Sequence, residues 1–392
     1  MEKIKILDID CCGCSACAVA CPKNAISMDF NGGGSYRPVI DGNRCVGCHM
    51  CEKVCTVLNA DSGKSAQPIS KENVYISVVK DKSVLERSSS GGIGYILAKK
   101  AVEQGMTVCG VTYSAENERA EHIVCGELSD LEKIQGSKYL QSANEEAFRT
   151  VLTMDKGVIF GTPCQIAGAD TVLRQKNKRD AFILVDIFCH GVPNQLLWNN
   201  HLKWLKSNKK IKGNSGFVFR QGKLFKINTE NYSAWYNEDA FYTFFLRGWL
   251  YNKSCYNCNF RRNSCADIRL GDCMVPKYEK LSFSPSCVIA NTAAGADFLE
   301  SCYDELEIYR EDYSVVDSVQ EKDNLPVPEK YEERLAALKN GSSPEELIHD
   351  IMVKGRIKSL LKNRILGTVK SRGDKSVLSD FAAKNESERE CQ

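Results

Sequence analysis

The chain has 392 residues, which is enough for a small module and one or two larger domains. A formal net charge of +2 gives no reason to expect a nucleic acid or an anionic membrane surface as a partner. The chain has 20 cysteines, no visible secretory segment and no apolar run long enough to span a membrane, so we predict a cytoplasmic protein without a membrane span.

The first 60 residues contain one cysteine pattern twice. Each copy reads Cys-x2-Cys-x2-Cys-x3-Cys, and every cysteine of the first copy recurs 34 residues later. Three thiolates this close in sequence hold three corners of a 4Fe-4S cube, and the fourth reaches the other cube, as in two-cluster ferredoxins. We therefore predict a bacterial-type two-cluster ferredoxin fold over residues 1–60. The expected ligands are Cys11, Cys14, Cys17 and Cys55 for one cluster and Cys45, Cys48, Cys51 and Cys21 for the other.

Two other interpretations of this pattern are disfavoured. A zinc module would more often show two separated Cys-x2-Cys pairs or a mixture of cysteine and histidine, and the spacing does not suit a disulfide framework. Cys12 lies between two expected ligands and is interpreted as a bystander thiol, and His49 as a solvated side chain.

Residues 61–72 are small and polar and are predicted to form a linker. Beyond them, apolar strands alternate with helices, which predicts an α/β fold (α+β overall) with a mixed, largely parallel sheet that is covered on both faces. The predicted strands are 73–80, 106–113, 122–128, 156–164 and 180–189, and the predicted helices are 92–105, a helix ending near 152, and about 165–175.

The second half of the chain is more varied. An antiparallel hairpin is predicted over 217–230 and an aromatic amphipathic helix over 239–252. A cysteine-rich knuckle follows at 254–273, and a strand and helix at 286–301 return to the sheet. Residues 315–392 are predicted to be a charged helical tail with a capped helix start in SSPEEL and a loose end.

A third metal site is expected at the edge of the sheet. Cys164 and Cys189 each follow a predicted buried strand, and parallel strands joined by one helix end at the same edge, where open α/β sheets bind ligands. Cys255 and Cys258 add a Cys-x2-Cys pair. These four thiols are enough for one more 4Fe-4S cluster.

Alternatives to this site remain open. Cys164 and Cys189 are also explained as small buried residues, since free cysteine is among the most buried residue types. Cys265 and Cys273 are rival ligands, and zinc is the rival metal.

Two strand-to-helix turns suit a phosphate-bearing cofactor. The loop of Ser88, Ser89, Ser90, Gly91 and Gly92 precedes a helix, whose N-terminal N–H groups would bind a pyrophosphate, although a serine N-cap explains the loop equally well. Lys138, in a second turn beginning at Gly136, is able to stabilise negative charge on a reduced flavin, although a solvated lysine is the default interpretation. Flavin is favoured because it links hydride chemistry to the single electrons of clusters.

Several segments, in this order, resemble the coenzyme F-420 hydrogenase/dehydrogenase beta subunit family: SSSGGIGYILAKKAVEQG, QGSKY, GTPCQIAGA, LVDIFCHGVP, SCYNCNF and ADIRLGD. The resemblance covers roughly residues 73–310 and implies a flavin domain, with an N-terminal part over 73–150 and a C-terminal part over 151–314. It departs from many bacterial relatives at 271–276, where GDCMVP replaces an aromatic-rich GDFWG-like segment.

The resemblance also implies roles for individual residues. FAD would be bound by Ser90, Gly91 and Gly92 of the first turn and by Ser137 and Lys138 of the second, with hydride exchange near Lys138. The intrinsic cluster would use Cys164, Cys189, Cys255 and Cys258. His190 is a candidate proton donor, for which a plain turn histidine is the competing interpretation.

We therefore expect an iron–sulfur flavoprotein oxidoreductase. FAD would exchange a hydride with coenzyme F-420 or another small donor or acceptor, and electrons would pass through the 4Fe-4S clusters to a redox partner protein, either ferredoxin or a catalytic subunit. The alternative is an electron-relay subunit with no substrate of its own. A third hypothesis makes the knuckle a structural zinc site on a protein with only two clusters.

Overall fold

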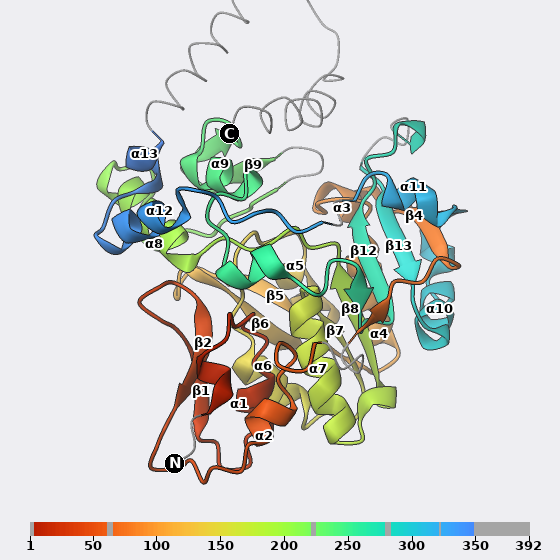
Figure 1. The fold of residues 1–392 in the computed structure, drawn as a ribbon. Coiled ribbons are helices and arrows are strands. Elements are labelled where there is room, and N and C mark those ends of the chain that lie inside the picture. The colour runs from red at the N-terminus through yellow and green to blue at the C-terminus, as the bar shows by residue number, and fades with distance from the viewer. Residues whose placement is uncertain (1–3, 61–65, 221–224, 279–283, 321–322, 349–392) are drawn as a thin grey trace, which may run out of the picture. The chain divides into compact units, whose positions relative to one another are not determined.

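An eight-stranded mixed sheet forms the centre of the fold (Figure 1). The computed structural model describes residues 4–60, 66–220, 225–278, 284–320 and 323–348. Residues 1–347 form one compact unit, which contains all the described helices and strands. The predicted loose end of the chain lies outside the described residues.

The strand order across this sheet is β14-β4-β13-β12-β8-β7-β5-β6. The strands are β4 (Val74–Val79), β5 (Thr107–Ser114), β6 (Arg119–Cys125), β7 (Gly157–Phe160), β8 (Phe182–Ile187), β12 (Ile268–Asp272), β13 (Ser286–Ala290) and β14 (Leu306–Arg310). The neighbours β12, β8, β7 and β5 run parallel. Antiparallel strands flank them on both sides. The predicted mixed α/β sheet is therefore confirmed, with parallel pairing confined to four strands, of which β7 and β8 lead to the expected ligands Cys164 and Cys189.

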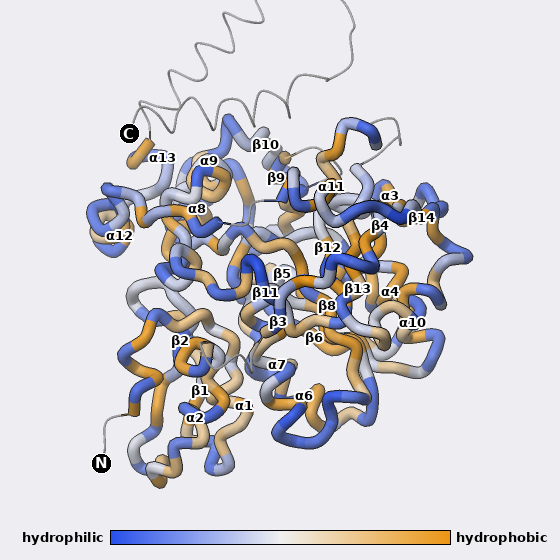
Figure 2. The backbone as a smooth tube through the Cα atoms, turned by 45° about the vertical axis from the view of Figure 1, so that its right-hand side comes forward, coloured by the Kyte–Doolittle hydropathy of each residue, from blue (hydrophilic) through white to orange (hydrophobic). Residues whose placement is uncertain are grey.

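Both faces of the sheet are buried. Side chains of adjacent strand residues point to opposite faces, so Val158 and Ile159 of β7 belong to different hydrophobic clusters. The covering helices are α3 (Lys82–Glu86), α4 (Ile93–Glu103) and α10 (Ala293–Glu300) on one face and α6 (Glu145–Val151) and α7 (Pro163–Gln175) on the other. Figure 2 shows the central strands as a mostly hydrophobic interior.

The N-terminal cysteine module packs directly on one of these helical layers. It consists of α1 (Ala16–Ala20), the antiparallel pair β1 (Ile26–Phe30) and β2 (Tyr36–Ile40), and α2 (Met50–Lys53). Its α1 shares a hydrophobic cluster with α6 and α7. Gly168 of α7 permits this approach, because a Cβ added there would lie 2.8 Å from Cys14 Cβ. The module and the sheet therefore share one core.

The segment between β8 and β12 differs in part from its prediction. Instead of one hairpin over 217–230, β9 (Lys226–Asn228) pairs with β10 (Ser233–Trp235), and Val218 adds only an isolated bridge to Asn228. Residues 221–224 of that prediction lie outside the described residues. The predicted aromatic helix is present as α9 (Ala240–Leu246), but it ends before Gly248, which has a positive φ of 61°.

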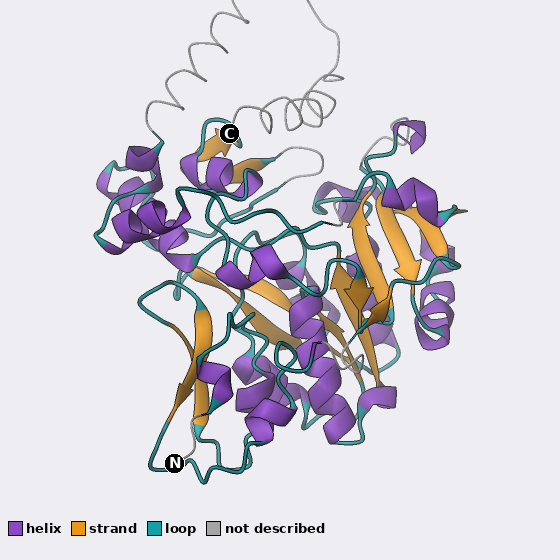
Figure 3. Cartoon of the chain, in the orientation of Figure 1, coloured by secondary structure: helices purple, strands orange, loops and turns teal. Residues whose placement is uncertain are grey.

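The remaining short elements connect and cover these parts (Figure 3). They are β3 (Gln67–Pro68), α5 (Leu131–Ile134), α8 (Gln195–Ser207), β11 (Asn263–Ser264), α11 (Tyr313–Asp317), α12 (Tyr331–Lys339) and α13 (Pro344–Leu347). The capped start predicted in SSPEEL is confirmed, since Ser343 and Glu346 exchange side chain–backbone hydrogen bonds. Among the helices in the described ranges, none combines the length and apolar character that crossing a bilayer requires.

Candidate functional site

The duplicated cysteine motif has a duplicated backbone. Gly13 and Gly47 have φ values of 71° and 66°, and Ser15 and His49 have φ values of 62° and 54°. The latter two residues are the N-caps of α1 and α2. Because the two sets of residues are 34 positions apart, the repeat in the sequence is also a repeat in conformation. The left-handed glycine turns the chain around the first thiol, so the Gly13 N–H lies 3.4 Å from Cys11 Sγ.

The eight predicted ligand cysteines of this module gather into two groups. Cys55 lies near Cys11, Cys14 and Cys17, and these thiols interact electrostatically. The pKa of Cys11 is raised to about 12, mainly by burial and next by Cys14. The second group lines one cavity beside α2 and consists of Cys21, Cys45, Cys48 and Cys51. Each group therefore takes three cysteines from one motif and one from the other, as the spacing predicts, while their roles as ligands stay predictions.

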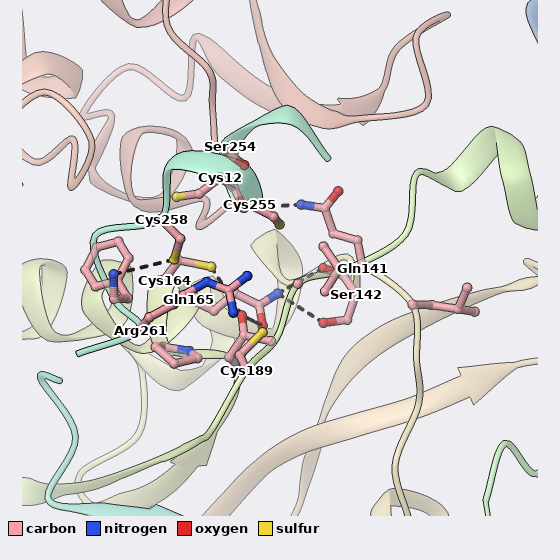
Figure 4. Close-up of a pocket in the computed structure, with 16 residues that line it drawn as sticks. Cys12, Gln141, Ser142, Cys164, Gln165, Cys189, Ser254, Cys255, Cys258 and Arg261 are labelled. Atoms are coloured by element: carbon pink, nitrogen blue, oxygen red, sulfur yellow. Dashed lines mark hydrogen bonds between the residues drawn. The ribbon is translucent and has the colours of Figure 1, made fainter. Parts of the chain in front are cut away.

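A second set of thiols meets at the carboxyl edge of the parallel strands. Cys164, Cys189, Cys255 and Cys258 line one cavity, which has an empty volume of about 570 Å³ and is partly open to solvent (Figure 4). Burial raises the pKa of the Cys189 thiol to about 12 and also raises that of Cys258. Three segments that are far apart in sequence thus contribute thiols to one place.

The local sequence explains how each thiol reaches this cavity. Thr162 caps α7 in a capping box with Gln165, so that Cys164 lies in the first turn of the helix directly after β7. Cys189 follows β8, and Gly191 then turns the chain where a Cβ would lie 2.4 Å from the ring of Tyr251. The parallel pairing of β7 with β8 places both strand ends at one edge.

Hydrogen-bond donors accompany these thiols. The Phe260 N–H donates to Cys258 Sγ at 3.4 Å, closing the loop that begins in a 3-10 turn (Lys253–Asn257). The hydroxyl of Thr162 lies 3.3 Å from Cys164 Sγ. Such donors stabilise thiolate sulfur, which is the form that binds metal.

Cys12 connects the two regions, which sequence reasoning missed. Its side chain lines the same cavity and hydrogen-bonds the thiols of Cys14 and Cys164. These bonds are the main cause that lowers the pKa of Cys14 to about 6 and also lowers that of Cys164. The spacing of the cysteines gives no signal for this contact, because it depends on how the N-terminal module packs against α7.

The polar surroundings hold this contact in place. Gln141 donates to the Cys12 carbonyl at 3.2 Å and accepts from the Tyr36 N–H at 3.2 Å. Its carbonyl also accepts from the Asn252 side chain at 2.6 Å, just before the knuckle. One side chain therefore ties together the cysteine module, the sheet and the Cys255 loop.

The rival ligands lie elsewhere. Cys265 packs against the hydrophobic cluster on the α7 face, near the carboxylate of Asp170. Cys273 is buried in another cluster together with Cys287 of β13. Neither of the two rivals belongs to the lining of the four-cysteine cavity.

The two turns expected to bind a flavin are adjacent. The Ser137 N–H donates to Ser89 Oγ at 2.8 Å. Gly92 is the N-cap of α4 with a φ of 81°, and Gly91 is confined between β4 and β13, where a Cβ would lie 2.4 Å from the Ser77 carbonyl oxygen. Ser90 Oγ lies 3.0 Å from Ser286 Oγ on β13. The loop therefore has a structural role in the sheet as well as its predicted binding role.

Lys138 and His190, the two predicted catalytic residues, have different surroundings. Burial lowers the pKa of Lys138 to about 7, and its Nζ donates to the Gln135 carbonyl at 2.9 Å. His190 follows the predicted ligand Cys189, and its carbonyl accepts a hydrogen bond from Arg261 at 2.8 Å. The structure thus places His190 beside the cysteine cavity, while its role as a proton donor stays a prediction.

Aromatic and charged side chains follow Lys138. The ring of Tyr139 stacks on Phe245 with centroids 4.6 Å apart, and its hydroxyl accepts from Arg220 at 3.2 Å. Arg220 in turn pairs with Asp272, in the segment that departs from the aromatic-rich pattern of relatives. Tyr139 and Phe245 therefore supply aromatic surface near a segment that itself has no aromatic side chain.

The fold and the thiol groups define an iron–sulfur protein built on a mixed α/β sheet. Comparison with known families assigns its two regions. Residues 154–315 match the family described as the C terminus of the beta subunit of coenzyme F420 hydrogenase/dehydrogenase, and residues 10–59 match the 4Fe-4S dicluster domain. Residues 10–59 are therefore similar to a 4Fe-4S dicluster domain, and the family resemblance of the sequence is confirmed for residues 154–315.

One solved structure is similar in fold at low sequence identity. A solved chain described as part of the xenon-derivatised F420-reducing NiFe hydrogenase complex from Methanosarcina barkeri is 16% identical, with a TM-score of 0.46. The similarity covers 73% of this chain and 94% of that one. The comparison with curated proteins found no match.

Proposed function

We propose that the chain is an iron–sulfur flavoprotein oxidoreductase that passes electrons between FAD and 4Fe-4S clusters, with coenzyme F-420 or another small molecule as hydride donor or acceptor. The observation that carries this proposal is the meeting of Cys164, Cys189, Cys255 and Cys258 at one cavity, whose wall is shared with the dicluster domain through Cys12. When bound, the clusters supply one-electron transfer and the flavin supplies exchange between a hydride and single electrons.

The four-cysteine cavity suits a cluster better than a single ion. Zinc holds four thiolates at about 2.3 Å each, so its ligands crowd around one point. Within the described residues, no group of three or more histidine, cysteine or acidic side chains is placed to hold one metal ion. Four thiols that surround a cavity, with N–H and hydroxyl donors beside them, suit a larger group that carries its own sulfur.

A single side chain, that of Cys12, lies between the four-cysteine cavity and the cysteine group that contains Cys14. Its thiol lies within hydrogen-bond reach of Cys14, an expected ligand of the dicluster domain, and of Cys164 of the cavity. The three sets of thiols therefore follow one another in space. The four-cysteine cavity comes first, then the group containing Cys14, and then the group containing Cys21. This order suits transfer between a substrate site in the sheet domain and the far end of the module.

The far end of the module is open to a partner. Cys48 is exposed, and Val46, two residues before it, has 62% of its surface accessible. The family is described as a beta subunit, which favours a redox partner protein such as ferredoxin or a catalytic subunit. The same features support the alternative of a relay subunit that has no substrate of its own.

The flavin side of the proposal depends on the adjacent turns. The N-terminus of α4 follows Ser90, Gly91 and Gly92, and helix N-termini suit phosphate groups. Ser137 brings Lys138 to this loop through its bond to Ser89. With a pKa of about 7, Lys138 is able to gain a proton as negative charge forms nearby, which suits a residue beside a reduced flavin.

The iron content of the protein tests whether the four-cysteine cavity holds a cluster. Anoxically purified protein is expected to hold about twelve iron atoms, as three cubes of four. Cys164→Ser should lose about a third of this iron and keep the remainder. Cys265→Ser, which alters a cysteine outside the cavity, is the matched control and should keep all of it. Full iron retention in Cys164→Ser would contradict the assignment, and eight irons with one zinc would favour the structural zinc hypothesis.

The release of flavin and the transfer of a hydride test the parts of the proposal that concern FAD and the small-molecule substrate. Acid treatment of the anoxic protein should release FAD, and reduced F-420 should bleach the cluster absorbance of the holoprotein. Absence of FAD would overturn the flavoprotein assignment. Bound FAD without reaction toward any small hydride donor, but with reduction by a protein partner, would favour the relay subunit.

A further inference from the structure

Arg261 brings a positive charge to the wall of the four-cysteine cavity. It follows Cys258 by three residues, is 7% exposed and lines the cavity with all four expected ligands. Figure 4 shows its side chain among Cys164, Cys189 and Cys258.

The guanidinium of Arg261 is only partly satisfied by protein. Its Nε donates to Asn324 Oδ1 at 2.8 Å and its Nη2 to the His190 carbonyl at 2.8 Å. Its Nη1 is buried and has no hydrogen-bond partner among the described residues. Both of its partners are neutral oxygens, so no carboxylate hydrogen-bonds this guanidinium within the part of the chain that the structure describes.

Other buried arginines of the chain have an acidic partner. Arg269 makes two bonds of 2.7 Å to the carboxylate of Asp186, and Arg220 pairs with Asp272. Leaving a buried charge uncompensated is strongly destabilising. Because Arg261 lines the four-cysteine cavity, an anionic group bound there would compensate its charge.

We infer that Arg261 is the counter-charge of the anionic cluster proposed for this cavity, with Nη1 donating a hydrogen bond to a thiolate or sulfide sulfur. This inference rests on the proposed function. A cube of iron and sulfide held by four thiolates is anionic and becomes more so when it gains an electron. The positive charge and the N–H donor therefore stabilise the reduced state more than the oxidised state and raise the reduction potential of the cluster.

A purely structural role is the competing explanation. Through Asn324, whose side chain also donates to the Cys258 carbonyl at 3.2 Å, Arg261 fastens the knuckle to a later segment. A tether would affect how well the cluster is held but not its potential. The counter-charge role therefore predicts a change in the reduction potential of the cluster, whereas the tether role predicts a change only in how well the cluster is held.

The test compares Arg261→Gln, Arg261→Lys and the control Arg262→Gln in the full chain. Arg262 is the next residue, but its side chain is 62% exposed and pairs with Asp323. Redox titration with low-temperature electron paramagnetic resonance follows the third cluster. Arg261→Gln should lower its reduced-to-oxidised ratio at fixed potential at least tenfold, which is 59 mV for one electron. Arg261→Lys should shift the ratio less, and Arg262→Gln should leave it unchanged.

Each outcome decides between the two roles. An unchanged potential in Arg261→Gln with full iron overturns the inference while leaving the proposed function intact. If Arg261→Gln loses the third cluster, retention in Arg261→Lys supports the counter-charge, whereas loss from both variants supports the tether. Wild-type protein with eight irons and only two cluster signals overturns the proposed function and this inference together.

Discussion

The two thiol-rich regions of this protein are built in opposite ways. In the N-terminal module, each predicted ligand group takes three cysteines from one seven-residue stretch and one from the other copy. At the sheet edge, Cys164, Cys189 and the pair Cys255 and Cys258 come from three segments that only the fold brings together. The first region depends mainly on local conformation, whereas the second depends on strand pairing, so different perturbations should affect them.

The largest expected effect comes from the ion pair beneath the second region. Arg269 and Asp186 are both fully buried, and Arg269 also donates to the carbonyls of Phe260, Arg261 and Asn263 in the knuckle. Arg269→Met leaves Asp186 unpaired, which should lower the free energy of unfolding by about 3–5 kcal/mol. Chemical denaturation measures this loss.

Iron analysis then shows whether the two regions separate. Arg269→Met should lose the third cluster preferentially, because the knuckle that carries Cys258 is released. Arg262→Met, on the exposed neighbour, is the control. Equal iron loss from both regions would contradict their independence.

A smaller effect is expected where the regions touch. Gly168→Val places a side chain against Cys14, whose Cβ and carbonyl lie 2.8 Å and 2.9 Å from the position of an added Cβ. Overpacking of this kind costs about 1–3 kcal/mol and should push α1 away from α7. Gly94→Ala is the control, since its Cβ would meet only an ordinary contact at 3.7 Å from Leu270. Thermal unfolding of the two variants gives the comparison, and equal stability would argue against close docking.

A change distant from both regions should affect neither. Burial opposes protonation of His201, but Asp239 and Glu345 outweigh it and raise its pKa to about 10. The pKa of His201 is higher in the folded protein than in the unfolded protein. Its contacts with Asp239 and Glu345 therefore stabilise the fold fully below about pH 6.5, and this stabilisation declines as the pH rises toward 10. His201→Gln should flatten the pH dependence of unfolding in that range.

The iron content of the His201→Gln variant is the second measurement on this variant. His201→Gln is expected to keep all its iron, since His201 joins α8 to α9 and α13 rather than to any cysteine loop. An unchanged slope of stability between pH 6.5 and 10 would show that His201 is not charged in the folded protein. Loss of iron would show that the helical layer supports the cysteine sites.

Much of the arrangement of the two thiol-rich regions could be predicted from the sequence, for physical reasons. Ligands that are close in sequence are constrained by the chain itself, so both groups of the N-terminal module could be predicted from spacing. The meeting of Cys164 and Cys189 was also predictable, because parallel strands joined by one helix end together. The turns at Ser88–Gly92 and Gly136–Lys138 could be named from their position before helices, but their assignment to FAD came from the family resemblance.

The remainder depended on packing that no short pattern encodes. The hairpin predicted over 217–230 failed in part because Phe217 and Phe219 pack against Tyr113 and Trp198 rather than across a strand pair. Arg261 could not be recognised, since its significance lies in a missing carboxylate. The position of Cys12 at the cavity follows from the packing of the N-terminal module on the sheet domain, which cysteine spacing does not encode.

Anomalous diffraction at the iron edge from crystals grown without oxygen tests the central claim most directly. The account predicts three iron peaks per chain, of which one lies in the cavity lined by Cys164, Cys189, Cys255 and Cys258. Two iron peaks in the N-terminal module, with zinc or no metal among these four cysteines, would contradict it.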